Sequence, residues 1–500
     1  MENKNVRTRF APSPTGYLHV GGLRTALYSY LLAKKYNGSF LLRIEDTDQT
    51  REVKGAVENI INTLSWAGLN YDEGPGKSGI CESYIQSERL PIYKKHAQQL
   101  IEQGDAYYCF CTQERLDKIR ESNEHEHANL SAGHAGSGNF SGAGYDRHCR
   151  DLSKEEVNKN LESGKSFVIR MKVPLEGQVT INDLIRGQVI IDYKVVDDQV
   201  IIKSDGFPTY HLAAVVDDHQ MKISHVIRGE EWLPSTPKHL LLYKYFGWDA
   251  PEFAHLPLLL NPDRSKLSKR QGDVAAEDYR AKGYLPEALI NFLALCGWNP
   301  GDGDEREVFS IQQLIDEFSI ERVGSSGAIF NLEKLQWLNG VYIREKSSQD
   351  IKKYIENTLG FDFKTNFAKF DDTKILKLID LYKDRVKTLQ ELLDSLKLFC
   401  FGPNNIYNQE AIDKWVTSNT KNHVLSLIEV FKKEENFTHD NLASVIKTLA
   451  KDLGIKLVDL AQPIRISLIG TSASPGVFEL LELLGKTESI NRLNNFIEII

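Results

Sequence analysis

Residues 9–22 read RFAPSPTGYLHVGG, and this stretch decides how the N-terminal part of the chain folds. The short run 6–10 is apolar or β-branched and predicts a strand, which the Pro/Gly-rich segment after it ends. A helix pattern follows from about residue 21 to 35, with Gly38 as a stop, and 40–44 predicts another strand. A strand, a helix and a strand form a βαβ unit, which predicts a parallel sheet.

The loop between that strand and that helix has the features of a nucleotide-binding turn. The positive end of the helix and its free N–H groups favour phosphate. Gly21 and Gly22 allow a base or a ribose to approach the backbone closely, and the ring of His19 can donate to a phosphate oxygen. The alternative is a helix-start histidine with glycines that serve packing only. The local sequence does not decide between the two.

A second basic stretch, SKLSKR at 265–270, follows an apolar strand predicted at 254–260. Two lysines and an arginine on a flexible loop can close over a triphosphate and neutralise charge on a leaving pyrophosphate. The alternative is a solvated basic turn, which is common in any protein. The two stretches together, in this order and at opposite ends of an α/β domain, favour ATP chemistry.

HVGG at 19–22 resembles the first signature of class I aminoacyl-tRNA synthetases, and KLSKR at 266–270 resembles the second. Three positions depart from the class pattern: Gly22 replaces a second histidine, and Leu267 and Arg270 replace Met and Ser. These variants are similar to the glutamyl branch of the class. Gly22 removes one phosphate donor, so more of that task falls to His19.

Further stretches resemble the bacterial-type glutamyl-tRNA synthetases over nearly the whole chain: RFAPSPTG at 9–16, RIEDTD at 43–48, FPTYHLA at 207–213, VDDH at 216–219, HVIRGEEW at 225–232, PIR at 463–465 and SPGVF at 474–478. The resemblance implies a ligase that activates L-glutamate with ATP and Mg²⁺ to glutamyl-adenylate. The enzyme would then transfer glutamate to the 3′-terminal adenosine of tRNA(Glu), with AMP and pyrophosphate as products. It also implies that activation needs tRNA.

The resemblance implies a set of ATP-binding residues, in which His19, Lys266 and Lys269 are catalytic because they stabilise the phosphates. The set is Pro12, Ser13, Thr15, Gly16, His19, Gly21, Gly22, Lys266, Leu267, Ser268, Lys269 and Arg270.

Glutamate carries two carboxylates and one ammonium, so its site needs two cationic or donor groups and one anion. Arg9, Glu45 and Arg228 end predicted strands, and the carboxyl ends of parallel strands face the ligand crevice. Arginine can grip a carboxylate through two hydrogen bonds. By resemblance, Arg9 and Tyr210 hold the side chain, Glu45 the amino group and Arg228 a carboxylate. The implied glutamate set is Arg9, Ala11, Ser13, Glu45, Tyr210 and Arg228, and the alternative is surface ion pairs.

Discrimination against glutamine would follow from charge. Glutamine in place of glutamate would leave a desolvated guanidinium without its anion. An unpaired buried charge costs several kcal/mol, enough to reject the neutral isostere by roughly a thousandfold or more.

Three of the six cysteines lie between 109 and 149, and in a reduced cytosolic chain such a cluster indicates metal rather than disulfides. Three thiols and one more ligand can bind Zn²⁺ tetrahedrally. By resemblance the ligands of this structural site are Cys109, Cys111, Tyr145 and Cys149. Asp151 stands where a different branch places a histidine. Alternatives are His148, His125, His127 or His134 as the fourth ligand, or three reduced thiols without metal.

The predicted fold class is α/β, a Rossmann-like parallel-sheet catalytic domain with an inserted α+β acceptor-binding domain and an all-α anticodon-binding region. Residues 1–82 form the first catalytic half, 83–205 the insert with the zinc knuckle at 109–149, 206–335 the second half with a stem-contact region, and 336–500 the helical region. Amphipathic patterns cover 374–398, 422–433, 442–453 and 477–484. The Gly/Ser-rich segment 122–144 predicts a loop.

The bulk composition is that of a soluble globular protein, with 41% hydrophobic and 26% charged residues. A net charge of −8 argues mildly against a nucleic-acid partner, although binding needs only a local basic surface. The N-terminus lacks an apolar signal region and no run is long enough to span a bilayer, so we expect a cytoplasmic protein without membrane contact. The resemblance suggests a monomer.

Other functions remain open at this point. A same-fold adenylyltransferase would share the His19 loop but would not need the roughly 165-residue tail from 336 to 500. A glutaminyl enzyme would carry a β-rich anticodon part, and a non-discriminating enzyme would also charge tRNA(Gln). A paralogue that glutamylates a modified base would lack the tail. Intact His19, Lys266 and Lys269 argue against an inactive tRNA-binding regulator.

Overall fold

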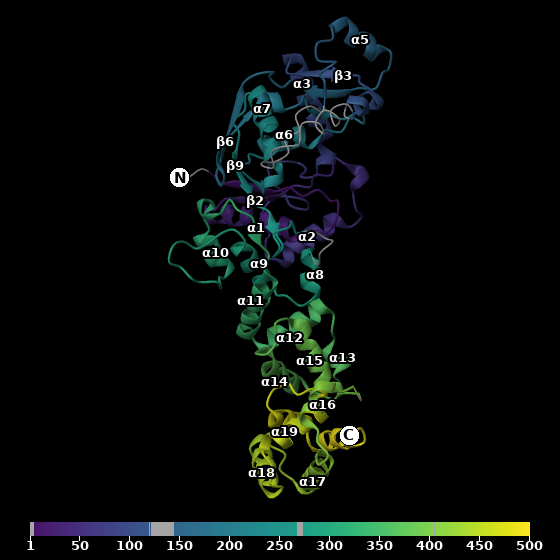
Figure 1. The fold of residues 1–500 in the computed structure, drawn as a ribbon. Coiled ribbons are helices and arrows are strands. Elements are labelled where there is room, and N and C mark those ends of the chain that lie inside the picture. The colour runs from purple at the N-terminus through teal and green to yellow at the C-terminus, as the bar shows by residue number, and fades with distance from the viewer. Residues whose placement is uncertain (1–4, 120, 122–144, 268–273, 405) are drawn as a thin grey trace, which may run out of the picture. The chain divides into compact units, whose positions relative to one another are not determined.

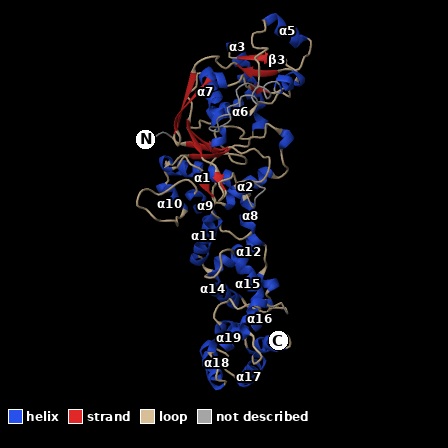
Figure 2. Cartoon of the chain, in the orientation of Figure 1, coloured by secondary structure: helices blue, strands red, loops and turns tan. Residues whose placement is uncertain are grey.

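The computed structural model describes residues 5–119, 121, 145–267, 274–404 and 406–500. The chain divides into two compact units (Figure 1). Unit 1 comprises Met1–Asp278 and Leu289–Asn331, and unit 2 comprises Tyr279–Ala288 and Leu332–Ile500. Strands occur in unit 1, whereas the described part of unit 2 is helical (Figure 2).

Unit 1 is built on a six-stranded sheet with the order β2-β1-β8-β9-β5-β6. The strands are β1 (Arg7–Phe10), β2 (Ser39–Leu42), β5 (Gln178–Asp183), β6 (Gly187–Asp192), β8 (His225–Gly229) and β9 (Glu252–Leu256). All neighbouring pairs are parallel except β5 and β6, which form an antiparallel hairpin at the edge. The parallel sheet that the first βαβ unit predicts is therefore present.

Helices cover both faces of the sheet, as the connections require. The chain moves from β1 to β2 in one direction through α1 (Val20–Lys35), and from β8 to β9 in the other through α7 (Thr236–Phe246). Because parallel crossovers are right-handed, these two helices lie on opposite faces (Figure 1). The direction of winding reverses between β1 and β8, and ligands bind at such a switch point in open α/β sheets.

Segment 83–205 contributes to two different sheets. A separate antiparallel sheet consists of β3 (Ala106–Cys109), β4 (Val168–Met171) and β7 (Val200–Ile202), with α3 (Leu90–Gln103) and α5 (Lys154–Glu162) in the same segment. In contrast, β5 pairs with β9 of the large sheet, and β6 pairs with β5 at the edge of that sheet. The domain boundaries stay predictions, and the hairpin is an addition that the sequence did not reveal.

The other elements of the first 331 residues are short. They are α2 (Ala56–Trp66), α6 (Tyr210–Gln220), α8 (Ala276–Ala281), α9 (Pro286–Leu295), α10 (Ile311–Glu317), the paired strands β10 (Leu259–Leu260) and β11 (Ala328–Ile329), and 3₁₀ turns at Gln49–Arg51, Gln86–Arg89, Tyr193–Val195, Glu230–Ser235 and Ile320–Arg322. Pro257 lies between β9 and β10, so the strand predicted at 254–260 is two strands.

From residue 332 onward the described chain is a succession of helices. They are α11 (Leu332–Glu345), α12 (Ser348–Leu359), α13 (Phe363–Asn366), α14 (Asp372–Lys383), α15 (Leu389–Phe401), α16 (Gln409–Trp415), α17 (Thr420–Lys433), α18 (His439–Asp452), α19 (Leu457–Ile469), α20 (Val477–Leu484) and α21 (Lys486–Ile497). Among the described residues, none of the helices combines the length and the apolar character needed to cross a bilayer.

One predicted pattern, 374–398, covers two helices rather than one. The chain breaks between α14 and α15, where Thr388 accepts a hydrogen bond from the N–H of Glu391 and so starts the second helix. Val386 is buried inside the break. The apolar periodicity continues through the turn because the Val386 side chain also faces the core. No Gly or Pro marks the interruption in the sequence.

Candidate active site

A cavity of about 870 Å³ opens at the carboxyl ends of the parallel strands. Its lining contains all six residues predicted for glutamate: Arg9, Ala11, Ser13, Glu45, Tyr210 and Arg228. It also contains nine of the predicted ATP residues: Pro12, Ser13, Thr15, Gly16, His19, Gly21, Gly22, Lys266 and Leu267. Ser268, Lys269 and Arg270 lie outside the described residues. The two signature stretches thus meet at one cavity.

His19 is the N-cap of α1, and its Nδ1 accepts a hydrogen bond of 2.9 Å from the backbone N–H of Gly21. A neutral imidazole that accepts at Nδ1 carries its proton on Nε2. Nε2–H is therefore the group that can donate to a phosphate oxygen. The same bond satisfies one of the unpaired N–H groups at the helix start.

The two glycines that follow His19 differ in their surroundings. A Cβ on Gly22 would lie 3.0 Å from the Leu18 side chain and 3.7 Å from the Phe10 ring, so this glycine lets α1 pack closely on the loop and on β1. A Cβ on Gly21 would meet only the His19 ring, at 3.2 Å. Packing therefore explains Gly22 without a ligand, whereas Gly21 leaves the backbone open beside the imidazole.

A buried network of ion pairs forms one wall of the cavity. Asp218 accepts from Arg9 Nε at 3.0 Å and from Arg43 Nη1 at 2.6 Å, and Arg43 Nη2 also donates to Glu45 Oε1 at 2.9 Å. All four side chains are at most 7% exposed. Burial would raise the pKa of Asp218, but Arg43 and Arg9 lower it below its ordinary value. Asp218 therefore stays anionic and already neutralises much of the charge of Arg9.

Glu45 is the second carboxylate of this wall, and burial raises its pKa above the ordinary value although Arg43 and Arg9 oppose the shift. Within the described residues its hydrogen bonds all go to one oxygen, Oε1. The Glu45 side chain lines the cavity, so its other oxygen, Oε2, can accept from a ligand there. Glu45 is thus placed to accept from a cationic ligand such as an ammonium group.

Arg228 is a buried cation whose described partners are all neutral. Its guanidinium donates to five acceptors: His255 Nε2 at 3.0 Å, Tyr210 Oη at 2.8 Å, Thr236 Oγ1 at 2.8 Å, the Trp232 carbonyl at 3.3 Å and His239 Nδ1 at 3.4 Å. No carboxylate of the described chain forms an ion pair with it. A buried charge without a counter-ion is costly, which favours an anionic ligand at this position.

Tyr210 extends the reach of Arg228 into the cavity. Its hydroxyl accepts from Arg228, so the phenolic proton remains available to donate to a ligand. Burial raises the pKa of this phenol, which keeps the proton on the oxygen. The ring packs against Trp232 with centroids 4.4 Å apart, and this contact holds the hydroxyl in place.

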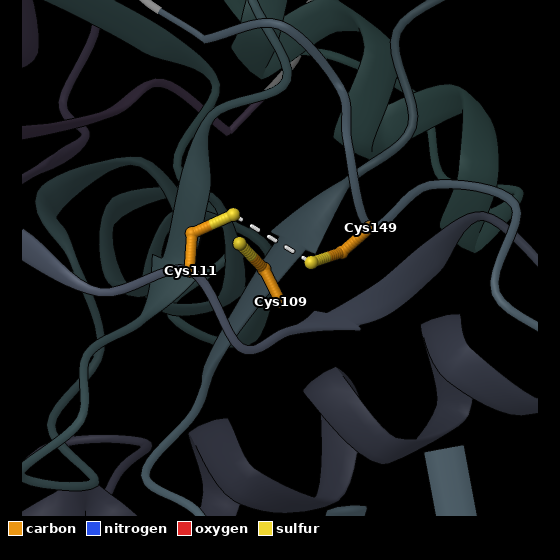
Figure 3. A group of neighbouring side chains, drawn as sticks. All are labelled: Cys109, Cys111 and Cys149. Atoms are coloured by element: carbon orange, nitrogen blue, oxygen red, sulfur yellow. Dashed lines mark hydrogen bonds between the residues drawn. The ribbon is translucent and has the colours of Figure 1, made fainter. Parts of the chain in front are cut away.

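Three thiols of the insert converge on one point (Figure 3). The sulfurs of Cys109, Cys111 and Cys149 all lie within 4.8 Å of one another, and Cys111 and Cys149 are 3.6 Å apart. The Tyr145 hydroxyl lies 3.2 Å from the Cys109 sulfur and 3.7 Å from that of Cys111. Sulfurs that share a tetrahedral Zn²⁺ with bonds of about 2.3 Å lie about 3.8 Å apart, so this donor set fits zinc.

The same cluster is fixed from outside by a buried carboxylate. Asp198 accepts from Arg147, Arg150 and Tyr107, which lie on both sides of the thiols in the chain. The Arg170 guanidinium lies 3.8 Å from the centre of the Tyr145 ring. A hydrogen bond with Cys149 lowers the pKa of the Cys109 thiol to about 4, which favours the thiolate form that metals bind.

Comparison with known proteins decides the family. Residues 5–337 match the model of the catalytic domain of class I tRNA synthetases (E and Q), and residues 349–497 match an anticodon-binding domain. The chain is 46% identical to the glutamate–tRNA ligase of Chloroherpeton thalassium, over 100% of this chain and 99% of that protein. The ligase of Chlorobium luteolum is 47% identical over the same shares.

The chain belongs to the glutamate–tRNA ligase family.

Solved structures of the glutamate–tRNA ligase family have the same fold. A crystal structure from Elizabethkingia meningosepticum, a complex of that ligase with its amino acid, superposes with a TM-score of 0.84 at 39% identity and covers 99% of both chains. A second structure, from Elizabethkingia anophelis, has a TM-score of 0.83 at 39% identity, over 99% of this chain and 100% of that one. The Rossmann-like fold with a helical anticodon-binding region is therefore confirmed.

Four residues that bind or support cavity-lining side chains were not predicted from the sequence: Arg43 and Asp218 beside Glu45 and Arg9, and His255 and Asp183 behind Arg228. Asp217 and Asp218 directly follow five buried apolar residues of α6, 212–216, which was a usable signal. His255 interrupts an apolar strand in a similar way. Asp183 carried no signal, because it becomes part of the site only through the pairing of β5 with β9.

Proposed function

We propose that this chain is a glutamate–tRNA ligase that makes glutamyl-adenylate from L-glutamate and ATP and then esterifies tRNA(Glu). The observation that carries the proposal is Arg228, a buried cation with only neutral partners in the cavity that also contains Glu45. Two arginines, Arg9 and Arg228, and one available carboxylate, Glu45, line the same cavity, and this set suits an amino acid with a second carboxylate. Membership of the family gives the reaction.

Glutamate would bind between the wall that contains Arg9 and Glu45 and the pair formed by Arg228 and Tyr210. Glu45 holds the ammonium group, and Arg228 with the Tyr210 hydroxyl holds the side-chain carboxylate, which the resemblance assigned to Arg9 and Tyr210. The longest contacts of Arg228, to the Trp232 carbonyl at 3.3 Å and to His239 at 3.4 Å, are those that a carboxylate would replace. Arg9 holds the other carboxylate with the guanidinium edge that Asp218 does not use.

Discrimination against glutamine then depends more on Arg228 than on Arg9. Arg9 already has an anionic partner in Asp218, so a neutral ligand leaves it paired. Arg228 has none among the described residues, so glutamine would leave its charge buried and uncompensated, which costs several kcal/mol.

The chemistry needs no protein nucleophile. An α-carboxylate oxygen of glutamate attacks the α-phosphorus of ATP in line, the bond to the bridging β-oxygen breaks, and pyrophosphate leaves. His19 Nε2–H, Lys266 and Lys269 stabilise the phosphates. Mg²⁺ would arrive with ATP, since phosphate oxygens are ligands it prefers, and it supplies charge neutralisation there. The 2′-hydroxyl of the terminal ribose then attacks the mixed anhydride, releasing AMP.

Several further properties belong to the same proposal. The insert meets the acceptor end, and Cys109, Cys111, Cys149 and Tyr145 hold a structural Zn²⁺ that shapes it. The helical region reads the anticodon, and its purely helical described part favours the glutamyl over the glutaminyl type. We further propose a monomeric, cytoplasmic enzyme. Charging of tRNA(Gln) in addition to tRNA(Glu) is the alternative that these observations leave open.

Pyrophosphate exchange into ATP tests the reaction, with glutamate or glutamine, and with or without total tRNA. We expect exchange only when glutamate and tRNA are both present. Exchange with glutamine would contradict the role of Arg228. No exchange under any condition would favour the same-fold adenylyltransferase or an inactive tRNA-binding regulator. Charging of purified tRNA(Glu) and tRNA(Gln) with labelled glutamate then separates the discriminating from the non-discriminating enzyme.

A further inference from the structure

Arg228 is connected to a buried carboxylate through a histidine. His255 Nδ1 lies 2.6 Å from Asp183 Oδ2, and His255 Nε2 lies 3.0 Å from Arg228 Nε. The side chains of Asp183 and His255 are both 0% exposed. The three groups therefore form a chain from carboxylate to imidazole to guanidinium that runs from the protein interior to the cavity.

The hydrogen bonds fix the tautomer of the imidazole. Asp183 accepts from four groups: the backbone N–H groups of Ile185 at 3.0 Å, Arg186 at 2.9 Å and His255 at 3.1 Å, and the His255 ring. Burial would raise the pKa of Asp183, but these bonds lower it, so it is an anion. An anionic acceptor at Nδ1 leaves the lone pair of a neutral ring on Nε2, directed at Arg228.

The ring stays neutral because its surroundings oppose a second proton. Burial, and after it the charges of Arg228 and Arg186, lower the pKa of His255, while Asp183 acts in the opposite direction. The groups that face the ring are Asp183 and Arg186 from the β5 end, Arg228 from β8, and His239 and Thr236 from α7. A protonated ring would direct a second N–H at the Arg228 Nε–H and repel it.

We propose that Asp183 and His255 are positioning residues for glutamate, which orient Arg228 without neutralising it. The inference rests on the proposed function. A carboxylate bonded directly to Arg228 would orient it equally well, but it would also cancel the charge that selects glutamate. The neutral imidazole supplies the acceptor, and Asp183 holds the ring one bond further away. Amino-acid affinity thus depends on the β5–β6 hairpin, which lies outside the two signature motifs.

Two substitutions at one position separate orientation from packing. His255→Gln keeps an acceptor near the position of Nε2, whereas His255→Leu has a similar size and no acceptor. Asp183→Asn places an amide N–H against Nδ1, which moves the ring proton to Nε2 and turns it toward Arg228. Each variant is assayed by pyrophosphate exchange at saturating tRNA, with separate titrations of glutamate and ATP.

We expect His255→Leu and Asp183→Asn to raise the KM for glutamate roughly 10- to 100-fold, the factor for losing a hydrogen bond to a charged group. The KM for ATP should change less than about threefold in all variants, and the KM for glutamate should do so in His255→Gln. A comparison of His255→Gln with Asp183→Asn gives the same test if His255→Leu does not fold.

Equal KM values for glutamate in the Gln and Leu variants would overturn the inference, as would a parallel rise in the KM for ATP, because either result assigns His255 to packing. A wild-type protein without glutamate-dependent exchange would instead overturn the proposed function, and the inference with it.

Discussion

The charge state of each residue at the cavity depends on its burial and on its nearest partner. Asp218 and Glu45 belong to one network, yet their pKa values shift in opposite directions. Asp218 accepts from two arginines, and these outweigh its burial. Among the described residues, the Glu45 carboxylate accepts only from Arg43, and burial outweighs this bond and the nearby charge of Arg9. The residue proposed to hold the substrate ammonium is therefore the one that takes up a proton more readily.

This difference predicts how glutamate binding depends on pH. Only ionised Glu45 attracts the ammonium group, and its raised pKa means that it protonates at a higher pH than an exposed glutamate, which titrates near about 4.3. The KM for glutamate should be constant above the raised pKa and should rise as the pH falls through it. Glutamate titrations of pyrophosphate exchange between about pH 5 and pH 8 measure this.

In Glu45→Gln the KM should be high throughout and should lack this rise. Glu58→Gln, at an exposed position of α2, is the matched control and should behave as the wild type. A rise of the same shape in Glu45→Gln would assign the titration to another group.

At the scale of secondary-structure elements, the sequence predicted a helix correctly where the apolar periodicity and the residues that start and stop a helix give the same ends. The helix α20 matches its predicted residues 477–484, because apolar periodicity and boundary residues agree there. The strand β5 was missed although its residues alternate between exposed and buried, since four of its six side chains are polar. Its place in the large sheet depends on pairing with β9, which no local pattern encodes.

In the candidate site, the cavity-lining residues could be predicted from the sequence, whereas their buried partners could not. Most of the predicted residues that line the cavity lie in a few short stretches of sequence, which the motifs picked out. Their partners were not picked out, because Arg9 and Asp218 are 209 residues apart in the chain, and Asp183 and His255 are 72 residues apart. A single sequence names the residues that can contact a ligand. It does not reveal which charge is already paired, and that fact shifted the specificity argument from Arg9 to Arg228.

Connections between elements of unit 2 also depend on single polar residues. Asn339 of α11 is fully buried; it accepts from the Leu285 N–H at 2.8 Å and donates to the Lys387 carbonyl at 2.7 Å. It thereby links segment 279–288 with the turn between α14 and α15. Asn339→Leu should leave the buried Leu285 N–H without its acceptor, which costs about 1–3 kcal/mol.

Because the chain has two units, a single unfolding free energy is not well defined, and local hydrogen exchange is the better measurement. We expect the Leu285 amide to exchange at least about tenfold faster in Asn339→Leu. Gln409→Leu, which removes an exposed side-chain pair with Asp413, should leave the exchange of that amide unchanged. Unaltered protection of Leu285 in Asn339→Leu would show that Asn339 does not hold the two segments together.

At the scale of the whole molecule, a net charge of −8 does not prevent tRNA binding, because contact is made by particular regions. The thiol cluster is the feature that would organise one such region, since its ligands come from both sides of the segment 122–144, which lies outside the described residues. Binding of structural zinc contributes about 10–16 kcal/mol in small domains, comparable to the stability of a whole domain. The loss of one ligand should therefore disorganise the part of the insert around the small sheet of β3, β4 and β7, while the large sheet remains folded.

Cys149→Ala tests this expectation. The purified wild-type protein should contain about one zinc per chain by atomic absorption, and the variant should contain less than about a tenth of that, because three ligands bind zinc far more weakly than four. In charging assays the KM for tRNA should rise, while the KM values for ATP and glutamate should change little. Cys81→Ala removes a half-buried thiol outside the cluster and should leave zinc and tRNA binding intact. Absence of zinc from the wild-type protein would contradict the proposed site. The three cysteines would then be reduced thiols joined with Tyr145 by hydrogen bonds, and Cys149→Ala would affect the insert only through packing.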